Sequence, residues 1–147
     1  MAAPQAPRTA VLIVCHGALA EALLETAVML VGPQPDAWAI AFMPGESPED
    51  LEGKVRAALA RLEPGDGALC LVDIPGGVPA RVLGALTMAP GSTLETVSGA
   101  NLPMLAEALL RRDHAGLPAL AEFAARAGRE GIVNLGPALR AAVARSS

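Results

Sequence analysis

The chain has 147 residues, the size of one ordinary domain, and carries a formal net charge of −4. Hydrophobic residues make up 52% of the chain and aromatic residues only 2%, so the core must be built from Ala, Val, Leu and Ile. An acidic chain without a basic stripe or aromatic platforms is not typical of nucleic-acid-binding proteins. No apolar segment is long enough to span a bilayer. The composition therefore predicts a single domain that neither binds nucleic acid nor inserts into a membrane.

The N-terminal residues 1–8 are rich in small residues and proline, which predicts a disordered tail. The apolar run that follows, residues 10–15, has Arg8 before it and small residues after it, as in an export signal. The run is short, however, and His16 and Gly17 interrupt it. We therefore interpret residues 10–15 as a first strand, buried on both faces, and not as a signal peptide.

Strand and helix patterns alternate along the rest of the chain. In order, they predict a helix at 19–31, a strand at 38–43, a helix from 48 to about 63, a strand at 68–72, a helix at 80–88, a strand at 93–97, helices at 103–112 and 117–128, a last short strand at 131–135, and a helical turn or two at 137–145. Ser47 is the expected N-cap of the second helix, with Pro48 at its first position.

This alternation is typical of a doubly wound α/β fold with a mostly parallel sheet. With right-handed crossovers, the expected strand order is 2-1-3-4, which makes the first and third strands neighbours. His16 follows the first strand and Asp73 follows the third. The two side chains are therefore expected to meet at the carboxyl edge of the sheet, where open α/β sheets bind their ligands.

The expected neighbours of His16 suit an anionic group. A carboxylate at Asp73 would fix the imidazole tautomer and stabilise the cation that forms when the other ring nitrogen is modified. Gly17, Gly76 and Gly77 remove side-chain bulk, expose backbone N–H groups and lie beside the positive ends of two helices. The arrangement fits a phosphoryl-accepting histidine, and it also fits a small-anion site. One His and one Asp are too few to hold a metal, so we expect no metal and no cofactor.

Structural roles remain open for several of these residues. Asp73 could cap the third helix, and Gly76 with Gly77 could simply form a tight turn between strand and helix. Asn101 is the expected cap of the fourth helix or a residue at the rim of the crevice. His114 lies in a polar turn and is expected at the surface.

The two cysteines, Cys15 and Cys70, lie inside apolar runs. This favours buried, reduced thiols in a cytoplasmic protein, although a disulfide between the neighbouring strands is conceivable. Adjacent strand residues point to opposite faces, so Cys15 is not expected to act as a nucleophile beside His16.

Five blocks in order, VCHGALAEALLETAVMLVG, FMPGES, LVDIPGGVPA, SGANLPMLAEALL and GREGI, resemble the mannose-type enzyme IIA component of the bacterial phosphoenolpyruvate:sugar phosphotransferase system. The resemblance covers about residues 9–135 and divides the chain into a tail (1–8), a domain (9–136) and a C-terminal helical tail (137–147). It implies a cytoplasmic phosphocarrier in which His16 takes a phosphoryl group from the phosphocarrier protein HPr and passes it to an enzyme IIB partner. It also implies that Asp73 supports His16, and that two copies form a dimer by exchanging a short antiparallel strand, here residues 131–135. The phosphoryl group would lie against Gly17, Gly76, Gly77 and Val78.

Three departures from the family pattern matter. Val78 stands where the family usually has serine, Pro75 stands where it often has an aromatic residue, and Ala80-Arg81 replace Phe-Asn. Val78 therefore lacks the serine hydroxyl, but it keeps the backbone N–H at this position. Arg81 and Asn101 are candidate partner contacts. The chain ends soon after the last predicted strand, so we expect no fused IIB domain and no transport by this chain alone.

Two other functions are open at this point. The domain could be a regulatory module of a phosphorelay, or the phosphoryl-donor subunit of a dihydroxyacetone kinase, which uses a related domain. It could also be a flavodoxin-like small-anion binder without transfer chemistry.

Overall fold

The computed structural model describes residues 9–63 and 66–147 of the chain. The predicted tail, residues 1–8, lies outside the described residues. The elements are β1 (Ala10–His16), α1 (Leu19–Val31), β2 (Ala37–Phe42), α2 (Pro48–Leu59), β3 (Ala68–Val72), α3 (Val78–Met88), β4 (Leu94–Ser98), α4 (Leu102–Arg111), α5 (Leu117–Glu130) and α6 (Leu135–Ser146).

The four strands form one parallel sheet in the order β2-β1-β3-β4, which confirms the predicted α/β topology. β1 pairs with β2 and β3, so that His16 lies opposite Phe42, and Val14 lies opposite Val72. The apolar side chains of β1 and β3 are buried on both faces, which explains why their sequences are apolar without alternation.

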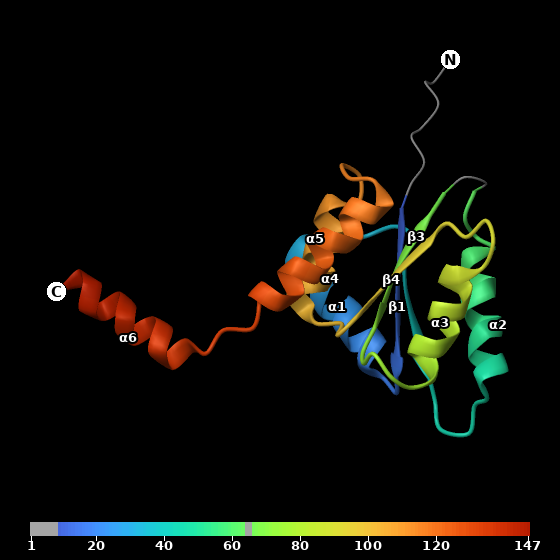
Figure 1. Cartoon of the computed structure of the whole chain (residues 1–147), viewed down its shortest axis with the longest axis horizontal. Helices are drawn as coiled ribbons and strands as arrows, with labels where there is room; N and C mark the ends of the chain where they lie inside the picture. Colours follow the sequence, from blue (N-terminus) through green and yellow to red (C-terminus); the bar gives the residue numbers. More distant parts are fainter. Residues whose placement is uncertain (1–8, 64–65) are drawn as a thin grey trace, which may run out of the picture.

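Helices cover the sheet on both faces (Figure 1): α1, α4 and α5 on one side, α2 and α3 on the other. Cys15 packs in the first of these two core layers and Cys70 in the second, and both thiols are free. The disulfide alternative is therefore wrong, because the two side chains point to opposite faces of the sheet. Burial raises the pKa of each thiol to about 12.

Two helix starts are fixed by side-chain caps. Ser47 Oγ accepts the Asp50 N–H at 3.1 Å and the Asp50 carboxylate accepts the Ser47 N–H at 2.9 Å, which closes a capping box at α2. Asn101 Oδ1 accepts the Met104 N–H at 3.0 Å at the start of α4. Both predicted caps are confirmed.

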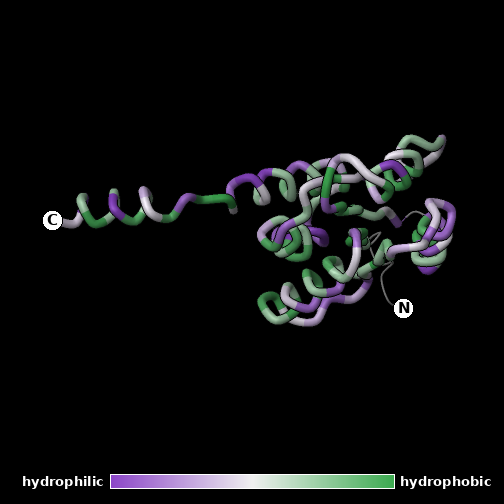
Figure 2. The backbone as a smooth tube through the Cα atoms, turned by 90° about the horizontal axis from the view of Figure 1, so that it is seen from below, coloured by the Kyte–Doolittle hydropathy of each residue, from purple (hydrophilic) through white to green (hydrophobic). Residues whose placement is uncertain are grey.

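The C-terminal end of the chain differs from the prediction. Residues 131–135 do not form a strand: Gly131 ends α5, residues 132–134 belong to no helix or strand, and Leu135 begins α6. A strand needs a neighbour for its backbone hydrogen bonds, and within the described chain this segment has none. α6 points away from the rest of the molecule in Figure 1, and Figure 2 shows hydrophobic and hydrophilic residues alternating along it. α2 is also shorter than predicted and ends at Leu59.

Close packing between α4 and α5 explains the glycines of GREGI. A Cβ added at Gly128 would lie 2.7 Å from Met104 Cε, and one added at Gly131 would lie 2.5 Å from Pro103 Cγ. Asn101 Nδ2 also donates to the Gly128 carbonyl at 3.1 Å. These contacts fix the end of α5 beside β4, where Ile132 lines a hollow of about 450 Å³ together with residues 96–99.

Candidate functional site

His16 and Asp73 meet at the carboxyl edge of the sheet, as the strand order predicted. His16 Nδ1 lies 2.8 Å from Asp73 Oδ2, and the same oxygen accepts the His16 backbone N–H at 3.0 Å. The other oxygen, Oδ1, accepts the Ile74 N–H at 3.1 Å. The Asp73 side chain is 12% exposed and that of His16 is 42% exposed, so the imidazole is accessible while the carboxylate beneath it is shielded.

The electrostatics of this pair fix the imidazole tautomer. Burial alone would raise the pKa of Asp73, but hydrogen bonds from the His16 ring and backbone hold it below its usual value. An ionised carboxylate can only accept, so Nδ1 carries the proton and Nε2 keeps its lone pair. Asp73 does not cap α3, because its oxygens are bonded to His16 and Ile74 and the N-cap position of α3 is Gly77.

Gly77 forms the wall next to Nε2. A Cβ at this position would lie 3.1 Å from His16 Cε1 and 3.4 Å from Nε2, and the backbone has a φ of +102°. Both the close approach and the left-handed conformation require glycine here. Gly76 differs, because a Cβ there would meet nothing within 4 Å.

Two helices begin beside the histidine without side-chain caps among the described residues. α1 starts after Gly17 and Ala18, and α3 starts after Gly77 with Val78 as its first residue. Their first backbone N–H groups are therefore available to an anion, and the helix dipoles favour one there. Val78 lacks the hydroxyl usual in the resembled family, but it keeps its backbone N–H.

The sequence did not identify one contact, that of Phe42. Its ring meets the His16 ring edge to face, with centroids 5.9 Å apart and an interplanar angle of 73°. Phe42 is the last residue of β2 and lies opposite His16, so the contact follows from the strand order together with a register that the sequence pattern does not specify.

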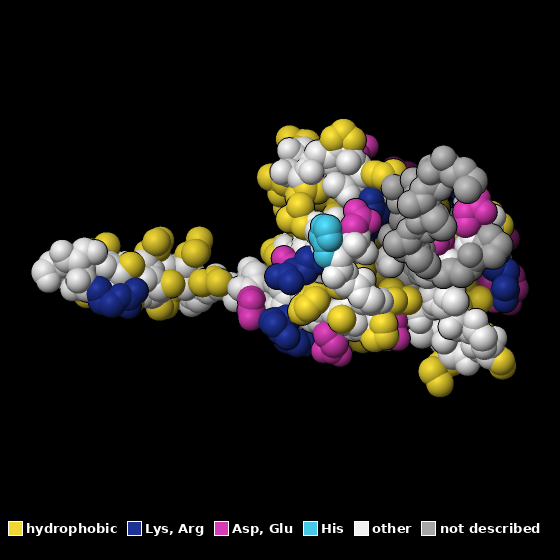
Figure 3. Space-filling model, turned by 90° about the horizontal axis from the view of Figure 1, so that it is seen from above, with side chains coloured by type: hydrophobic (Ala, Val, Ile, Leu, Met, Phe, Trp, Pro, Cys, Tyr) yellow, Lys and Arg dark blue, Asp and Glu magenta, His cyan; other side chains and the backbone are white. Residues whose placement is uncertain are grey.

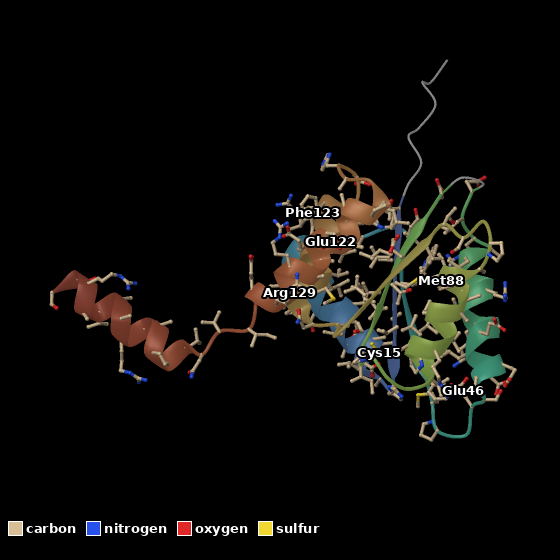
Figure 4. The ribbon with its side chains drawn as sticks, viewed as in Figure 1. Cys15, Glu46, Met88, Glu122, Phe123 and Arg129 are labelled. Carbon is tan, nitrogen blue, oxygen red and sulfur yellow. The ribbon has the colours of Figure 1, made fainter. Side chains whose placement is uncertain are left out.

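Hydrogen bonds and an ion pair of Lys54 and Glu46 stabilise the turn after β2. Lys54 Nζ donates to the Ala41 carbonyl at 2.9 Å and pairs with Glu46 at 2.6 Å, while Glu46 accepts the Met43 N–H at 2.7 Å. Hydrogen bonding to Lys54 lowers the pKa of Glu46. Glu46 and Cys15 mark this end of the molecule in Figure 4.

The remaining candidate residues lie away from the histidine contacts described above. Arg81 is exposed and lines a hollow of about 230 Å³ between α2 and α3, together with Glu49 and Glu52. Asn101 is half-buried, and both of its polar atoms bond to the chain's own backbone. His114 is exposed in the turn after α4.

Within residues 9–63 and 66–147, no group of three or more His, Cys, Asp or Glu side chains is placed to hold a metal ion. No helix in the described part of the chain has the length and apolar character needed to cross a membrane.

The fold and the site define a class: an α/β protein with an accessible, carboxylate-supported imidazole at the switch point of its sheet, facing two open helix N-termini. A family model described as the PTS system fructose IIA component, EIIA-man, matches residues 10–125. The chain therefore belongs to the EIIA-man family of phosphotransferase-system IIA components.

Known relatives agree with this assignment. The chain is 40% identical over 124 residues to the PTS system mannose-specific EIIAB component of Escherichia coli, covering 84% of this chain and 38% of that protein. It is 34% identical over 107 residues to the PTS system fructose-specific EIIA component of Bacillus subtilis, covering 73% of each chain. A solved EIIA structure from Streptococcus agalactiae superposes with a TM-score of 0.80 at 27% identity, covering 88% of this chain and 98% of that one.

Proposed function

We propose that the protein is a phosphocarrier that accepts a phosphoryl group on His16 Nε2 and passes it on. The observation that carries the proposal is the 2.8 Å contact between Asp73 and His16 Nδ1, which leaves Nε2 as the free nucleophile. Family membership supports phosphoryl transfer as the chemistry of this site.

The transfer step needs only the residues already described and a phosphohistidine donor. The Nε2 lone pair of His16 forms the new N–P bond while the P–N bond to the donor histidine breaks, and the bonding electrons return to the donor nitrogen. The His16 ring then carries a positive charge, with its proton on Nδ1 facing Asp73. The carboxylate stabilises this cation, and the reverse movement of electrons releases the phosphoryl group to the acceptor.

The phosphoryl oxygens would be bound by backbone groups. Gly76, Gly77 and Val78 would supply N–H groups at the start of α3, where the helix dipole favours the negative charge of about −1.5 to −2 that a phosphoryl group brings. The N–H of Gly17 already donates to the Phe42 carbonyl at 2.9 Å, so Gly17 would border the phosphoryl group without binding it through this N–H. Val78 cannot make the hydrogen bond that a serine hydroxyl would offer. We propose that Arg81 and Asn101 act through partner docking and not through the phosphoryl group.

The proposed partners are proteins. We propose phospho-HPr as donor and an enzyme IIB as acceptor in sugar uptake, with all three in the cytoplasm. The E. coli relative is an EIIAB component, which supports a IIB acceptor. The specificity for a sugar would lie in the membrane partner, because the site accepts only a phosphoryl group.

We further propose that the protein is a dimer that exchanges part of the predicted strand 131–135: residues 132–134 would pair antiparallel with β4 of a second copy. In the described part of the chain, β4 pairs with β3 alone, so its other edge is open. Ile132 and Val133 expose 78% and 54% of their surface, as expected for residues whose partner is another molecule.

The experiment that tests the proposal is transfer of labelled phosphate from phosphoenolpyruvate through enzyme I and HPr to this protein. Acid-labile label on the wild type, absent from His16→Ala, is the expected result. A folded wild type that takes no label from its cognate HPr would contradict the phosphocarrier role and favour a regulatory module.

A further inference from the structure

α6 has an apolar stripe with no partner within the described chain. Leu135, Leu139 and Val143 recur at i, i+4 and i+8, and they expose 62%, 60% and 70% of their surface. None of the residues of α6 is buried against the rest of the described chain. In Figure 3 hydrophobic side chains line this arm, which stands clear of the body. Three such side chains on one helix face are typical of a surface that another helix or protein covers.

The link between α5 and α6 is short, and α6 stands away from the body of its own copy. Gly128 and Gly131 fix the end of α5 against Met104 and Pro103, and only residues 132–134 follow before Leu135. Three extended residues span about 10 Å. In this conformation the stripe contacts no other part of the described chain and is open to a surface on another molecule.

The proposed strand exchange determines the end of the second copy's sheet at which α6 would begin. β4 runs from Leu94 to Ser98 toward the edge of the sheet that carries His16. An antiparallel segment 132–134 on the open edge of β4 runs the other way and brings Leu135 to the amino end of β4. This is the end of the sheet opposite the candidate site.

A hollow of about 370 Å³ lies at that end, between the C-terminal ends of α2 and α3 and beside the start of β4; we call it the amino-edge hollow. Its apolar lining is formed by Leu59, Leu62, Leu86, Ala89, Pro90 and Leu94. Met88, at the same end of α3 in Figure 4, is 83% exposed next to it. Apolar side chains of this size match the leucines of the α6 stripe.

The charges around the two surfaces are complementary. α6 carries Arg140 and Arg145 and no acidic residue. The charged residues that line the amino-edge hollow are Glu63, Asp66 and Arg56, so acidic groups outnumber basic ones. A helix of 12 residues is about 18 Å long, enough to cross the ends of two neighbouring helices.

We propose that α6 of one copy docks on the amino-edge hollow of a second copy, so that the exchanged arm consists of a strand and a helix. This inference rests on the proposed strand exchange and extends it. The second copy is the occupant favoured here because strand exchange would bring the segment next to α6 onto that copy, and because the two surfaces are complementary in charge. A three-residue strand alone would bury far less than the roughly 1,200 Å² typical of a stable interface.

The test compares two variants of the full chain by sedimentation equilibrium. Leu139→Glu places a charge in the stripe, whereas Ala144→Glu places the same charge on the opposite side of α6. We expect Leu139→Glu to raise the dimer dissociation constant by about tenfold or more, because a buried leucine is lost at two symmetry-related sites. Ala144→Glu should match the wild type.

Disulfide trapping tests whether α6 docks on the amino-edge hollow. A chain with Leu135→Cys and Ala89→Cys should form an intermolecular disulfide, while the matched pair Leu135→Cys and Ala22→Cys, with its second cysteine on α1, should not. Both native cysteines are buried and do not compete. A link to Ala22→Cys alone would show that α6 docks elsewhere and would overturn the proposal.

The results distinguish failure of the α6 docking from failure of the strand exchange and of the phosphocarrier role. A wild-type dimer that neither Leu139→Glu nor Ala144→Glu weakens would overturn the docking of α6 and leave the strand exchange standing. A wild type that is monomeric at all concentrations would overturn both. Phosphoryl transfer to His16, measured separately on the same samples, tests the phosphocarrier role whichever result is obtained.

Discussion

Replacing Gly77 by alanine tests the wall next to the reactive nitrogen of His16. The added Cβ would lie 3.1 Å from His16 Cε1, whereas carbon atoms in ordinary contact lie about 3.5–4.0 Å apart. The imidazole must therefore move by several tenths of an ångström, or the loop must. Because the Cβ would also lie 3.4 Å from Nε2, either movement changes the approach of the phosphoryl group.

Gly77→Ala should lower both the melting temperature and the rate of phosphorylation. A non-glycine residue at a φ of +102° costs about 1–3 kcal/mol, which for a domain of this size lowers the melting temperature by roughly 2–10 °C. A displacement of reacting groups approaching 1 Å costs on the order of 100-fold in rate. We expect the initial rate of phosphorylation by phospho-HPr to fall by about 10- to 100-fold below the melting transition.

Gly76→Ala is the matched control. Its Cβ would meet nothing within 4 Å, its φ is not positive, and alanine keeps the backbone N–H. Melting temperature and initial rate should both stay near the wild-type values. Equal losses in the two variants, or a Gly77→Ala variant as fast as the wild type, would refute the steric reasoning.

Four further predictions concern charge, thiols and capping. Asp73→Asn should lower the phosphorylation rate by about 100-fold or more, because an amide cannot stabilise the imidazolium, and a near-wild-type rate would contradict the role given to Asp73. Since the folded state holds the pKa of Asp73 below its usual value, its contribution to stability is present above about pH 4 and lost as the pH falls toward the folded value. Between pH 7 and pH 3, the melting temperature of the wild type should therefore fall further than that of Asp73→Asn. Equal falls in the two proteins would contradict a stabilising role for the Asp73 carboxylate. Cys15 and Cys70, with pKa values of about 12, should not react with a disulfide reagent at pH 8 until the chain is unfolded; prompt reaction of native protein would show that a thiol is accessible. Ser47→Ala should lower the free energy of unfolding by about 1 kcal/mol in urea titrations, and an unchanged value would mean that the capping box contributes nothing.

The sheet and its histidine–aspartate pair were predictable because local patterns encode them. Uninterrupted apolar runs marked β1 and β3 as central strands, and the handedness of the crossovers left one natural order for them. This strand order alone places His16 and Asp73 side by side at the carboxyl edge of the sheet. The caps Ser47 and Asn101 were predictable for the same reason, since each bonds to a residue three positions away.

Features that depend on another molecule or on tertiary distances were not predictable. Residues 131–135 have the apolar pattern of a strand, but a strand forms only where another edge accepts it, and the chain alone offers none to this segment. The contact of Phe42 with His16 depends on the register between β1 and β2, which propensity does not specify. In the sequence, Gly128 and Gly131 stand out only as part of the block GREGI, and the packing of α4 on α5 explains why both are glycine.

The phosphocarrier role itself is tested most directly by phosphoryl transfer to two histidine variants. The chain has two histidines: His16 beside Asp73 and the exposed His114. With labelled phosphoenolpyruvate, enzyme I and HPr, we expect acid-labile label on the wild type and on His114→Ala, and none on a folded His16→Ala. Label that persists on His16→Ala, or a wild type that takes up none, would contradict the assignment of His16 as the phosphoryl acceptor.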